Sequence, residues 1–497
     1  MKRFISLVLI SFLLMGTPVI THAEETNIQD KIIYNIMVDR FNNGTLVVGD
    51  EVDVDDPYAY NGGDIRGIIK KLDHIKDLGI HAIQLSPIME NAANGFHGYW
   101  ITDMYEIEPL FGTKEDFEEL IEEAHKRDID VYMEFVMNYV SEDHPFVTDK
   151  DKKDWISEPS IEPTDASFWL EDVKQLNLDQ DEVASYIEDV ADYWMDEFAI
   201  DGFVLHAADQ ASPQFLNEFT AHMKEKSPEF VLLATLLDEE ADMTPFVDNE
   251  GIDAVENYAV YEKLNDIFAQ VNTPVSEIME VWDEAVEEKS LLFVDTFNTP
   301  RFSYTTAEQS RSALTTWKLA LTFMYTSPGT PVVIQGSELP MYGPTFLESQ
   351  YLVPFNSSDP DLEEYYYRIS ALKGQFPVLQ DGDFEQIIVE EGLSVFKRSN
   401  GEETMYIAIN NDDTMREATI TDDIGEGNQL HGLLSDMIVR KQDGGFTFEI
   451  SRETAEVFII EEDLGVNWVF ILTIVAIPVI FAIFVFYVSK RGKTRNS

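Results

Sequence analysis

The sequence contains no cysteine among its 497 residues. Without thiols the chain can form no disulfide framework, carry no lipid-modified cysteine and bind no metal through thiolates. Basic residues are also scarce: 34 lysines and arginines stand against 93 aspartates and glutamates, a formal net charge of −59. Such a chain repels nucleic acid and anionic lipid surfaces, so we expect no nucleic-acid partner. We interpret the excess as a solvated acidic surface suited to a salty or alkaline exterior; the alternative is a role in capturing cations.

The N-terminus carries the pattern of a secretory signal. In MKRFISLVLISFLLMG two basic residues precede a short apolar run, and the following THA ends at Ala23 as a signal-peptidase site would. We predict a signal peptide over residues 1–23. The alternative is an N-terminal membrane helix.

A second apolar run, from Trp468 to Val488, contains no charged residue over 21 positions. As a helix it would extend ~31 Å, the thickness of a bilayer core. The basic tail SKRGKTRNS follows it, and positive charge stays on the cytosolic side. The sequence therefore predicts a transmembrane helix over 466–488 and a cytoplasmic tail over 489–497. This describes a single-pass protein of the cell membrane with an extracellular body.

Between residues 24 and 380, short apolar runs alternate with amphipathic stretches. IIKKLDHIKDLG has helical spacing of its apolar residues and ends at Gly79, whereas HAIQLSP, VYMEFVMN and TPVVIQG read as buried strands. This alternation over more than 300 residues predicts a parallel sheet closed into a (β/α)8 TIM barrel. A doubly wound sheet is the alternative, but no Gly-rich phosphate loop follows any strand.

Two segments depart from the alternation. The polar stretch over 139–181 contains prolines and predicts a short inserted B domain after the third strand. Over 381–465 the pattern changes to short strands such as LSVFKRS and TMYIAINN, separated by turns. That pattern is typical of a small antiparallel β domain. We therefore predict an α/β fold: a TIM barrel with a short inserted B domain, a C-terminal antiparallel β-sandwich domain and one C-terminal transmembrane helix.

Seven segments of the body, in order, resemble glycoside hydrolase family 13, the α-amylase family. They are IIYNIMVDRFNNG, YNGGDIRGIIKKLDHIKDLGIHAIQLSPI, HGYWITDMYEIEPLFGTKEDFEELIEEAHKRDIDVYMEFVMNYVSEDHPF, DGFVLHAAD, FVLLATLLDEE, FVDTFNTPRF and SPGTPVVIQGSELPM. Each is weak alone, but their order and spacing match the family over nearly the whole body. The resemblance implies a barrel that acts on α-glucans.

The positions that perform hydrolysis in that family hold other residues here. The family uses a nucleophilic aspartate, an acid/base glutamate and a third carboxylate, helped by an arginine and two histidines. The corresponding residues are His206 for the nucleophile, Thr235 for the acid/base, Asn298 for the third carboxylate, Val204 for the arginine, and Tyr139 and Phe297 for the histidines. A threonine hydroxyl cannot protonate a leaving group near neutral pH. We therefore predict a pseudoenzyme that does not hydrolyse glycosidic bonds.

Three other carboxylates lie near predicted strand ends, where barrel sites form. They are Glu134, Asp209 and Asp295. No feature of the sequence pairs any two of them, so a new catalytic set is the less favoured interpretation.

The HGYW box keeps features that face the sugar in the family. The resemblance implies that His97 and Tyr99 line the subsite beside the cleavage point, with the tyrosine stacked on the sugar ring and Trp100 beside it. Aromatic stacking requires no catalytic group. We predict substrate binding by these three residues; packing of the loop is the alternative.

Calcium binding is not favoured. Asn138 matches a calcium ligand of the family, but Gln175 replaces a ligand aspartate and Gln210 replaces a histidine whose carbonyl helps. A hard cation requires several oxygens with charge among them. We expect no cofactor, with Asn138 as the remaining candidate ligand for Ca²⁺.

Together these features predict a catalytically inactive homologue at the cell surface that binds an α-glucan, such as a maltooligosaccharide, or a protein partner. The rival is an active, membrane-anchored glycoside hydrolase of carbohydrate metabolism with an unorthodox site. The replaced carboxylates favour binding. Release of reducing ends from starch would favour the rival.

Overall fold

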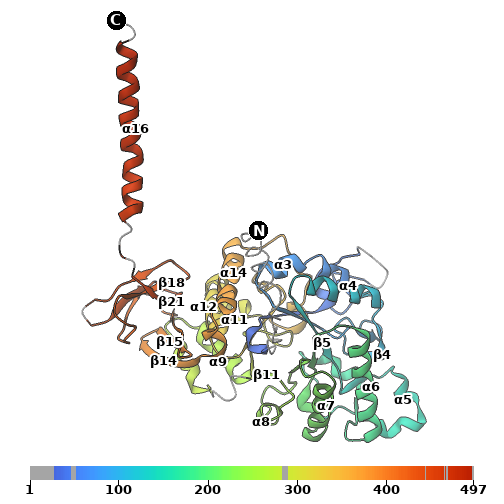
Figure 1. Cartoon of the computed structure of the whole chain (residues 1–497). Helices are drawn as coiled ribbons and strands as arrows, with labels where there is room; N and C mark the ends of the chain where they lie inside the picture. The colour runs from blue at the N-terminus through green and yellow to red at the C-terminus, as the bar shows by residue number, and fades with distance from the viewer. Residues whose placement is uncertain are drawn as a thin grey trace, which may run out of the picture. The chain divides into compact units, whose positions relative to one another are not determined.

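The computed structural model describes residues 27–45, 52–282, 289–442, 444–463, 465 and 468–494. The chain divides into two compact units, one of residues 1–270 and 277–382 and the other of 271–276 and 383–497 (Figure 1). The predicted signal segment, 1–23, lies outside the described residues.

The first unit is built on a closed barrel whose neighbouring strands are all parallel, in the order β1-β13-β12-β11-β10-β9-β5-β2. The strands are β1 (Ile33–Ile36), β2 (Ala82–Leu85), β5 (Asp130–Phe135), β9 (Gly202–Leu205), β10 (Val231–Ala234), β11 (Ala254–Glu256), β12 (Ser290–Leu292) and β13 (Thr330–Ile334). β2, β9, β10 and β13 are buried at every position, as expected of strands that face side chains inside and helices outside. The predicted TIM barrel is confirmed.

Helices follow the strands and cover the barrel (Figure 1). They are α2 (Ile65–Ile69), α3 (Leu72–Asp77), α4 (Lys114–His125), α6 (Asp181–Glu197), α7 (Pro213–Lys226), α8 (Thr244–Val247), α9 (Tyr258–Ala269), α11 (Phe302–Glu308), α12 (Ala313–Thr326), α13 (Phe346–Ser349), α14 (Pro360–Gln375) and α15 (Val378–Asp381). Capping residues in the local sequence mark where helices begin. In α4, Thr113 and Asp116 form a capping box in which each side chain accepts from the other's backbone N–H.

Two smaller sheets lie in the loops of this unit. A hairpin pairs β3 (Met89–Asn91) with β4 (Ile101–Ile107). The segment after β5 forms a three-stranded sheet of β6 (Tyr139–Ser141), β8 (Val173–Leu176) and β7 (Ile156–Ser157), with the short helices α5 (Pro145–Thr148) and η4 (Phe168–Asp172). This inserted segment supplies Trp169 to the site described below.

The second unit is an antiparallel β domain, as predicted. One sheet has the order β14-β15-β16-β21-β18-β19 and the other pairs β17 with β20. The strands are β14 (Asp383–Glu390), β15 (Leu393–Ser399), β16 (Thr404–Asn410), β17 (Arg416–Ile420), β18 (Asn428–Gly432), β19 (Ile438–Val439), β20 (Phe446–Ile450) and β21 (Thr454–Glu462). Its core joins side chains of both sheets, such as Tyr406 with Phe448 and Phe458.

The last helix, α16, covers Trp468–Thr494 and contains Pro478. In the part of the chain that the structure describes, no helix combines the length and the apolar character required to cross a membrane. The predicted transmembrane helix over 466–488 and the single-pass membrane location are therefore wrong. The helix also extends beyond the predicted end, into the segment expected to form a separate tail.

Candidate functional site

The carboxyl ends of the barrel strands bring the candidate residues together. In the register of the barrel, Glu134 on β5 pairs with Val204 on β9, and Leu205 on β9 pairs with Ala234 on β10. His206 and Thr235 are the next residues along the chain, so they emerge at the same end. Sites of TIM barrels form at this end.

A small inner cavity of about 30 Å³ lies among these residues. It is lined by Asn35, Gln84, Tyr99, Glu134, His206, Ala207, Thr235, Leu236, Leu237, Glu256, Thr296, Phe297 and Asn298. That volume holds one or two water molecules and no sugar ring. Of the positions predicted to be degenerate, His206, Thr235, Phe297 and Asn298 line the cavity, whereas Val204 is buried within β9.

A buried, hydrogen-bonded pair of side chains, His206 and Glu134, lines the inner cavity. Nδ1 of His206 lies 2.6 Å from Oε1 of Glu134, and the hydroxyl of Tyr99 donates to the same oxygen at 3.3 Å. Both His206 and Glu134 are 4% exposed. Nδ1 of His206 hydrogen-bonds to this carboxylate, whereas Nε2 has no hydrogen-bond partner among the described residues. Glu134, considered above as an unpaired candidate, is therefore hydrogen-bonded to His206, the residue predicted to replace the nucleophile.

Aromatic rings fill the space around Tyr99. His97 and His206 both stack on its ring, with centroid distances of 5.3 and 4.5 Å, and Trp169 approaches at 4.7 Å. Tyr99 is 3% exposed. Sugar stacking on Tyr99 therefore requires these rings to move.

The other residues of the HGYW box hold this arrangement in place. Nδ1 of His97 accepts from the backbone N–H of Tyr99 at 3.0 Å, and burial lowers the pKa of His97 to about 3, which keeps it neutral. Nε1 of Trp100 donates to the carbonyl of Trp169 at 2.8 Å. Trp169 also meets Tyr139 edge to face at 5.4 Å. The box thus packs the inserted segment over the barrel.

Thr235 has a structural role in the turn after β9. Its Oγ1 accepts from the N–H of Ala207, which has a φ of 49°, and points to the carbonyl of Leu205 at 3.4 Å. A hydroxyl held by two backbone groups is poorly placed to protonate a leaving group. Asn298 is half-buried, and within the described part of the chain its Oδ1 has no hydrogen-bond partner.

Glu256 is a site residue that the sequence analysis missed. It ends β11, and Oε2 accepts from the N–H of Leu236 at 2.9 Å. Burial, with the charges of Glu134 and Asp209 as further causes, raises the pKa of Glu256 to about 8. The only available signal was its place at the end of a strand-like run, DAVENY, which resembles none of the catalytic boxes.

The residues near Asn138 do not fit a calcium ion. Nδ2 of Asn138 donates to the carbonyls of His206 and Ala207 at 2.9 and 2.7 Å. Gln175 accepts from Ser160 through Oε1 and donates to the carbonyl of Gln210 through Nε2. Amide donors thus occupy the carbonyls, and no carboxylate joins them. Among the described residues, no group of three His, Asp or Glu could hold a metal ion.

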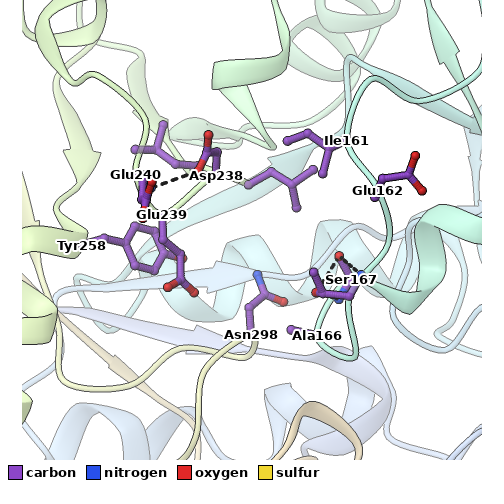
Figure 2. A pocket seen from close by; sticks show the side chains of 12 residues that line it. Ile161, Glu162, Ala166, Ser167, Asp238, Glu239, Glu240, Tyr258 and Asn298 are labelled. Atoms are coloured by element: carbon purple, nitrogen blue, oxygen red, sulfur yellow. Dashed lines mark hydrogen bonds between the residues drawn. The ribbon is translucent and has the colours of Figure 1, made fainter.

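A wider outer cleft of about 590 Å³ borders the inner cavity, with which it shares Leu236, Leu237 and Asn298. Figure 2 shows Ile161 and Glu162 of the inserted segment on one side and the loop after β10 on the other, with Asn298 between them. The lining is Ile161, Glu162, Thr164, Ala166, Ser167, Leu236, Leu237, Asp238, Glu239, Glu240, Tyr258 and Asn298. No lysine, arginine or histidine is among these residues. The cleft offers apolar walls and acidic groups in a space that admits a short oligosaccharide.

Comparison with known proteins shows where the chain belongs. Residues 35–423 match the family described as "Alpha amylase, catalytic domain". A cyclomaltodextrinase of Geobacillus thermopakistaniensis is 28% identical over 439 residues, which cover 82% of this chain and 73% of that protein. The α-amylase of Geobacillus thermoleovorans, solved with acarbose, is 34% identical to this chain. Its superposition has a TM-score of 0.81 and covers 88% of this chain and 100% of the amylase chain. An Anoxybacillus α-amylase is 35% identical, with a TM-score of 0.83 over 89% of this chain and 100% of its own.

Proposed function

Because this chain belongs to the α-amylase family, we propose that it is a member that binds an α-glucan without hydrolysing it. One observation supports the proposal: at the carboxyl end of the barrel, the inner cavity is only about 30 Å³, and it is lined by His206, Thr235 and Asn298, which we expect to replace the family's three carboxylates. Losing even one member of a catalytic set costs several orders of magnitude in rate. The relatives named cyclomaltodextrinase, and the solved structure of an α-amylase with acarbose, motivate an α-glucan as the ligand.

The outer cleft is the part of the site with room for that ligand. Its carboxylates and hydroxyls can accept or share hydrogen bonds with sugar hydroxyls, and Ile161 and Leu237 offer apolar contact. Because the inner cavity holds no sugar ring, a glucan would lie in the cleft without reaching Glu134. We expect weak binding, roughly −4 to −5.5 kcal/mol, in the high micromolar to millimolar range.

A hydrolase with a new pair of carboxyl groups is the second candidate. Glu134, hydrogen-bonded to His206, and Glu256, whose pKa burial raises to about 8, both line the inner cavity. A carboxyl group with a raised pKa is typical of a catalytic acid. The volume of the cavity argues against it, because a scissile bond cannot reach either group until the rings around Tyr99 move.

Calorimetric titration of the purified chain with maltoheptaose tests the binding proposal. We expect saturable heat for the wild type and at least a tenfold loss in a Leu237→Asp variant, which places a charge on the cleft wall. A Glu118→Gln variant on the exposed face of α4 is the control and should bind as the wild type does. If no heat appears at several millimolar maltoheptaose, the glucan role fails and a protein partner becomes the better explanation.

A further inference from the structure

Three side-chain amides meet at the inner cavity. Asn35 on β1 and Gln84 on β2 are paired in the register of the barrel, Asn298 lies in the loop after β12, and all three line the cavity. Oδ1 of Asn35 and Oδ1 of Asn298 are enclosed, so the amide nitrogens of these two residues are the atoms left to face the cavity. In the described part of the chain no hydrogen bond engages the side chain of Gln84, although it is only 3% exposed. A buried amide without a partner costs free energy that a suitable ligand group regains.

The lining selects a neutral group that both accepts and donates hydrogen bonds. The amide nitrogens of Asn35, Gln84 and Asn298 are donors, and the side-chain oxygen of Gln84 is an acceptor. Burial raises the pKa of Glu256 to about 8, so near neutral pH its carboxyl group adds an O–H donor. These donors disfavour a cation, and the carboxyl group of Glu134 in the same lining disfavours an anion. A hydroxyl group meets both requirements, as water does.

The size of the inner cavity restricts what can bring that hydroxyl in. A polar cavity of about 30 Å³ has room for water, and a hydroxyl is the sugar group that can reproduce the hydrogen bonds of a displaced water molecule. The ring that carries the hydroxyl has to stay in the outer cleft. Of the three amides, Asn298 is the one that lines both spaces, and Figure 2 shows it between the two walls of the cleft. An entering hydroxyl therefore passes Asn298.

A free chain end is the part of a glucan that can reach a narrow cavity in this way. Within a chain, each glucose has a neighbour on both sides, and its C1 and C4 oxygens are used in the linkages. A terminal glucose has one neighbour and keeps a free hydroxyl on the side that points away from the chain. A cyclic glucan has no such residue, and a ring of seven glucose units is too wide for a cleft that admits a short oligosaccharide.

We propose that the site recognises a free end of a linear α-glucan, with the terminal glucose units in the outer cleft and one hydroxyl group of the last unit in the inner cavity. The hydroxyl accepts from the amide N–H groups of Asn298 and Gln84 and donates to the side-chain oxygen of Gln84. This inference rests on the glucan binding proposed above and adds that open chains are bound in preference to closed ones.

The first test compares an open and a closed glucan of the same size by calorimetry on the whole chain. Maltoheptaose and β-cyclodextrin both contain seven glucose units, but only maltoheptaose has ends. We expect β-cyclodextrin to bind at least tenfold more weakly. Equal or tighter binding of β-cyclodextrin would overturn the preference for chain ends and leave glucan binding intact, whereas an absence of heat with both ligands would overturn both proposals.

A reduced ligand then shows which end enters. The free hydroxyls at C4 of one end and at C1 of the other offer the cavity the same chemistry. In maltoheptaitol the ring at the C1 end is opened, and the C4 end is unchanged. A loss of affinity of at least tenfold relative to maltoheptaose assigns the cavity to the C1 end, and unchanged affinity assigns it to the C4 end.

A Gln84→Leu variant locates the hydroxyl in the inner cavity. Leucine is close to glutamine in size and lacks the amide, and because that amide has no partner the melting temperature should not fall. Affinity for maltoheptaose should fall at least fivefold, whereas the weak affinity for β-cyclodextrin should not change. The matched control is Gln214→Leu on the exposed face of α7, which should bind both ligands as the wild type does. A folded Gln84→Leu protein with wild-type affinity for maltoheptaose would overturn the role of the inner cavity.

Discussion

Nδ1 of His206 lies 2.6 Å from Oε1 of Glu134, and both side chains are almost completely buried. We propose that His206 occupies the position of the α-amylase family's nucleophile, which has to face the substrate. Here its side chain is paired with a carboxylate from the neighbouring strand and covered by Tyr99. The reacting position has become part of the packing of the barrel.

Removing either member of the Glu134–His206 pair should strongly reduce the stability of the protein. Glu134→Ala leaves the imidazole and the Tyr99 hydroxyl without their acceptor, and breaking a buried pair in this way costs about 3 kcal/mol. His206→Ala should cost a similar amount, and the double variant should be less destabilised than the sum of the two. Denaturant unfolding of the four proteins measures this coupling. Additive losses would show that the two side chains do not stabilise each other.

The raised pKa of Glu256 should make the stability of the protein depend on pH. Its pKa is about 8 in the folded protein, above its ordinary value of 4.5, so the folded state binds more protons between these values. The free energy of unfolding should therefore fall as the pH rises from about 4.5 to 8. The Glu256→Gln substitution removes this contribution to the pH dependence of stability. We expect the variant to gain about 1–3 kcal/mol relative to the wild type at pH 9 and little at pH 4, since partial exposure reduces the full effect.

The comparison of Glu256→Gln with the wild type isolates this group from the other acids of the chain. Urea midpoints at pH 4, 7 and 9 are sufficient. A difference in stability between the two proteins that does not change with pH would contradict the raised pKa.

The ring of Trp169 should hold the inserted segment against the site. Its ring lies against Tyr99, His206 and Tyr139 and is 1% exposed. Trp169→Ala should destabilise the protein by about 3–5 kcal/mol and enlarge the inner cavity. Thermal melting measures the first effect, and a gain in maltoheptaose affinity would report the second. Unchanged melting would show that the ring does not hold the segment in place.

Restoring one catalytic residue should not restore catalysis. His206→Asp recreates the nucleophile, but Val204 and Thr235 still replace the arginine and the acid/base. The new carboxylate would also lie beside Glu134, and two close carboxylates do not both ionise readily. We expect no release of reducing ends from starch by this variant. Activity in the single variant would show that the remaining residues are still competent.

The barrel could be predicted because it depends on local sequence, and the degenerate boxes stay a prediction from local sequence. Alternating strand and helix patterns indicate the fold, and each box is a contiguous stretch such as DGFVLHAAD. The contact between Glu134 and His206 could not be predicted, because these residues are 72 positions apart and meet only through the pairing of β5 with β9. Glu256 was missed for the same reason: burial and neighbouring charges give it its character.

The predicted membrane location shows the opposite failure. The uncharged run Trp468–Val488 is a purely compositional signal. The structure contains a helix there, α16, but within the described residues no helix meets the requirements for crossing a membrane. The composition of this run correctly indicated a helix, but its assignment to a membrane is not supported by the structure.

The release of reducing ends from maltoheptaose by the purified chain tests the central claim most directly. Our account predicts no release above the buffer blank, because the inner cavity holds no sugar ring and, as we propose, His206, Thr235 and Asn298 replace the family's three carboxylates. Turnover that persists through purification and is lost in the conservative variants Glu134→Gln or Glu256→Gln would contradict the account. That result would identify these two residues as the catalytic pair of a hydrolase.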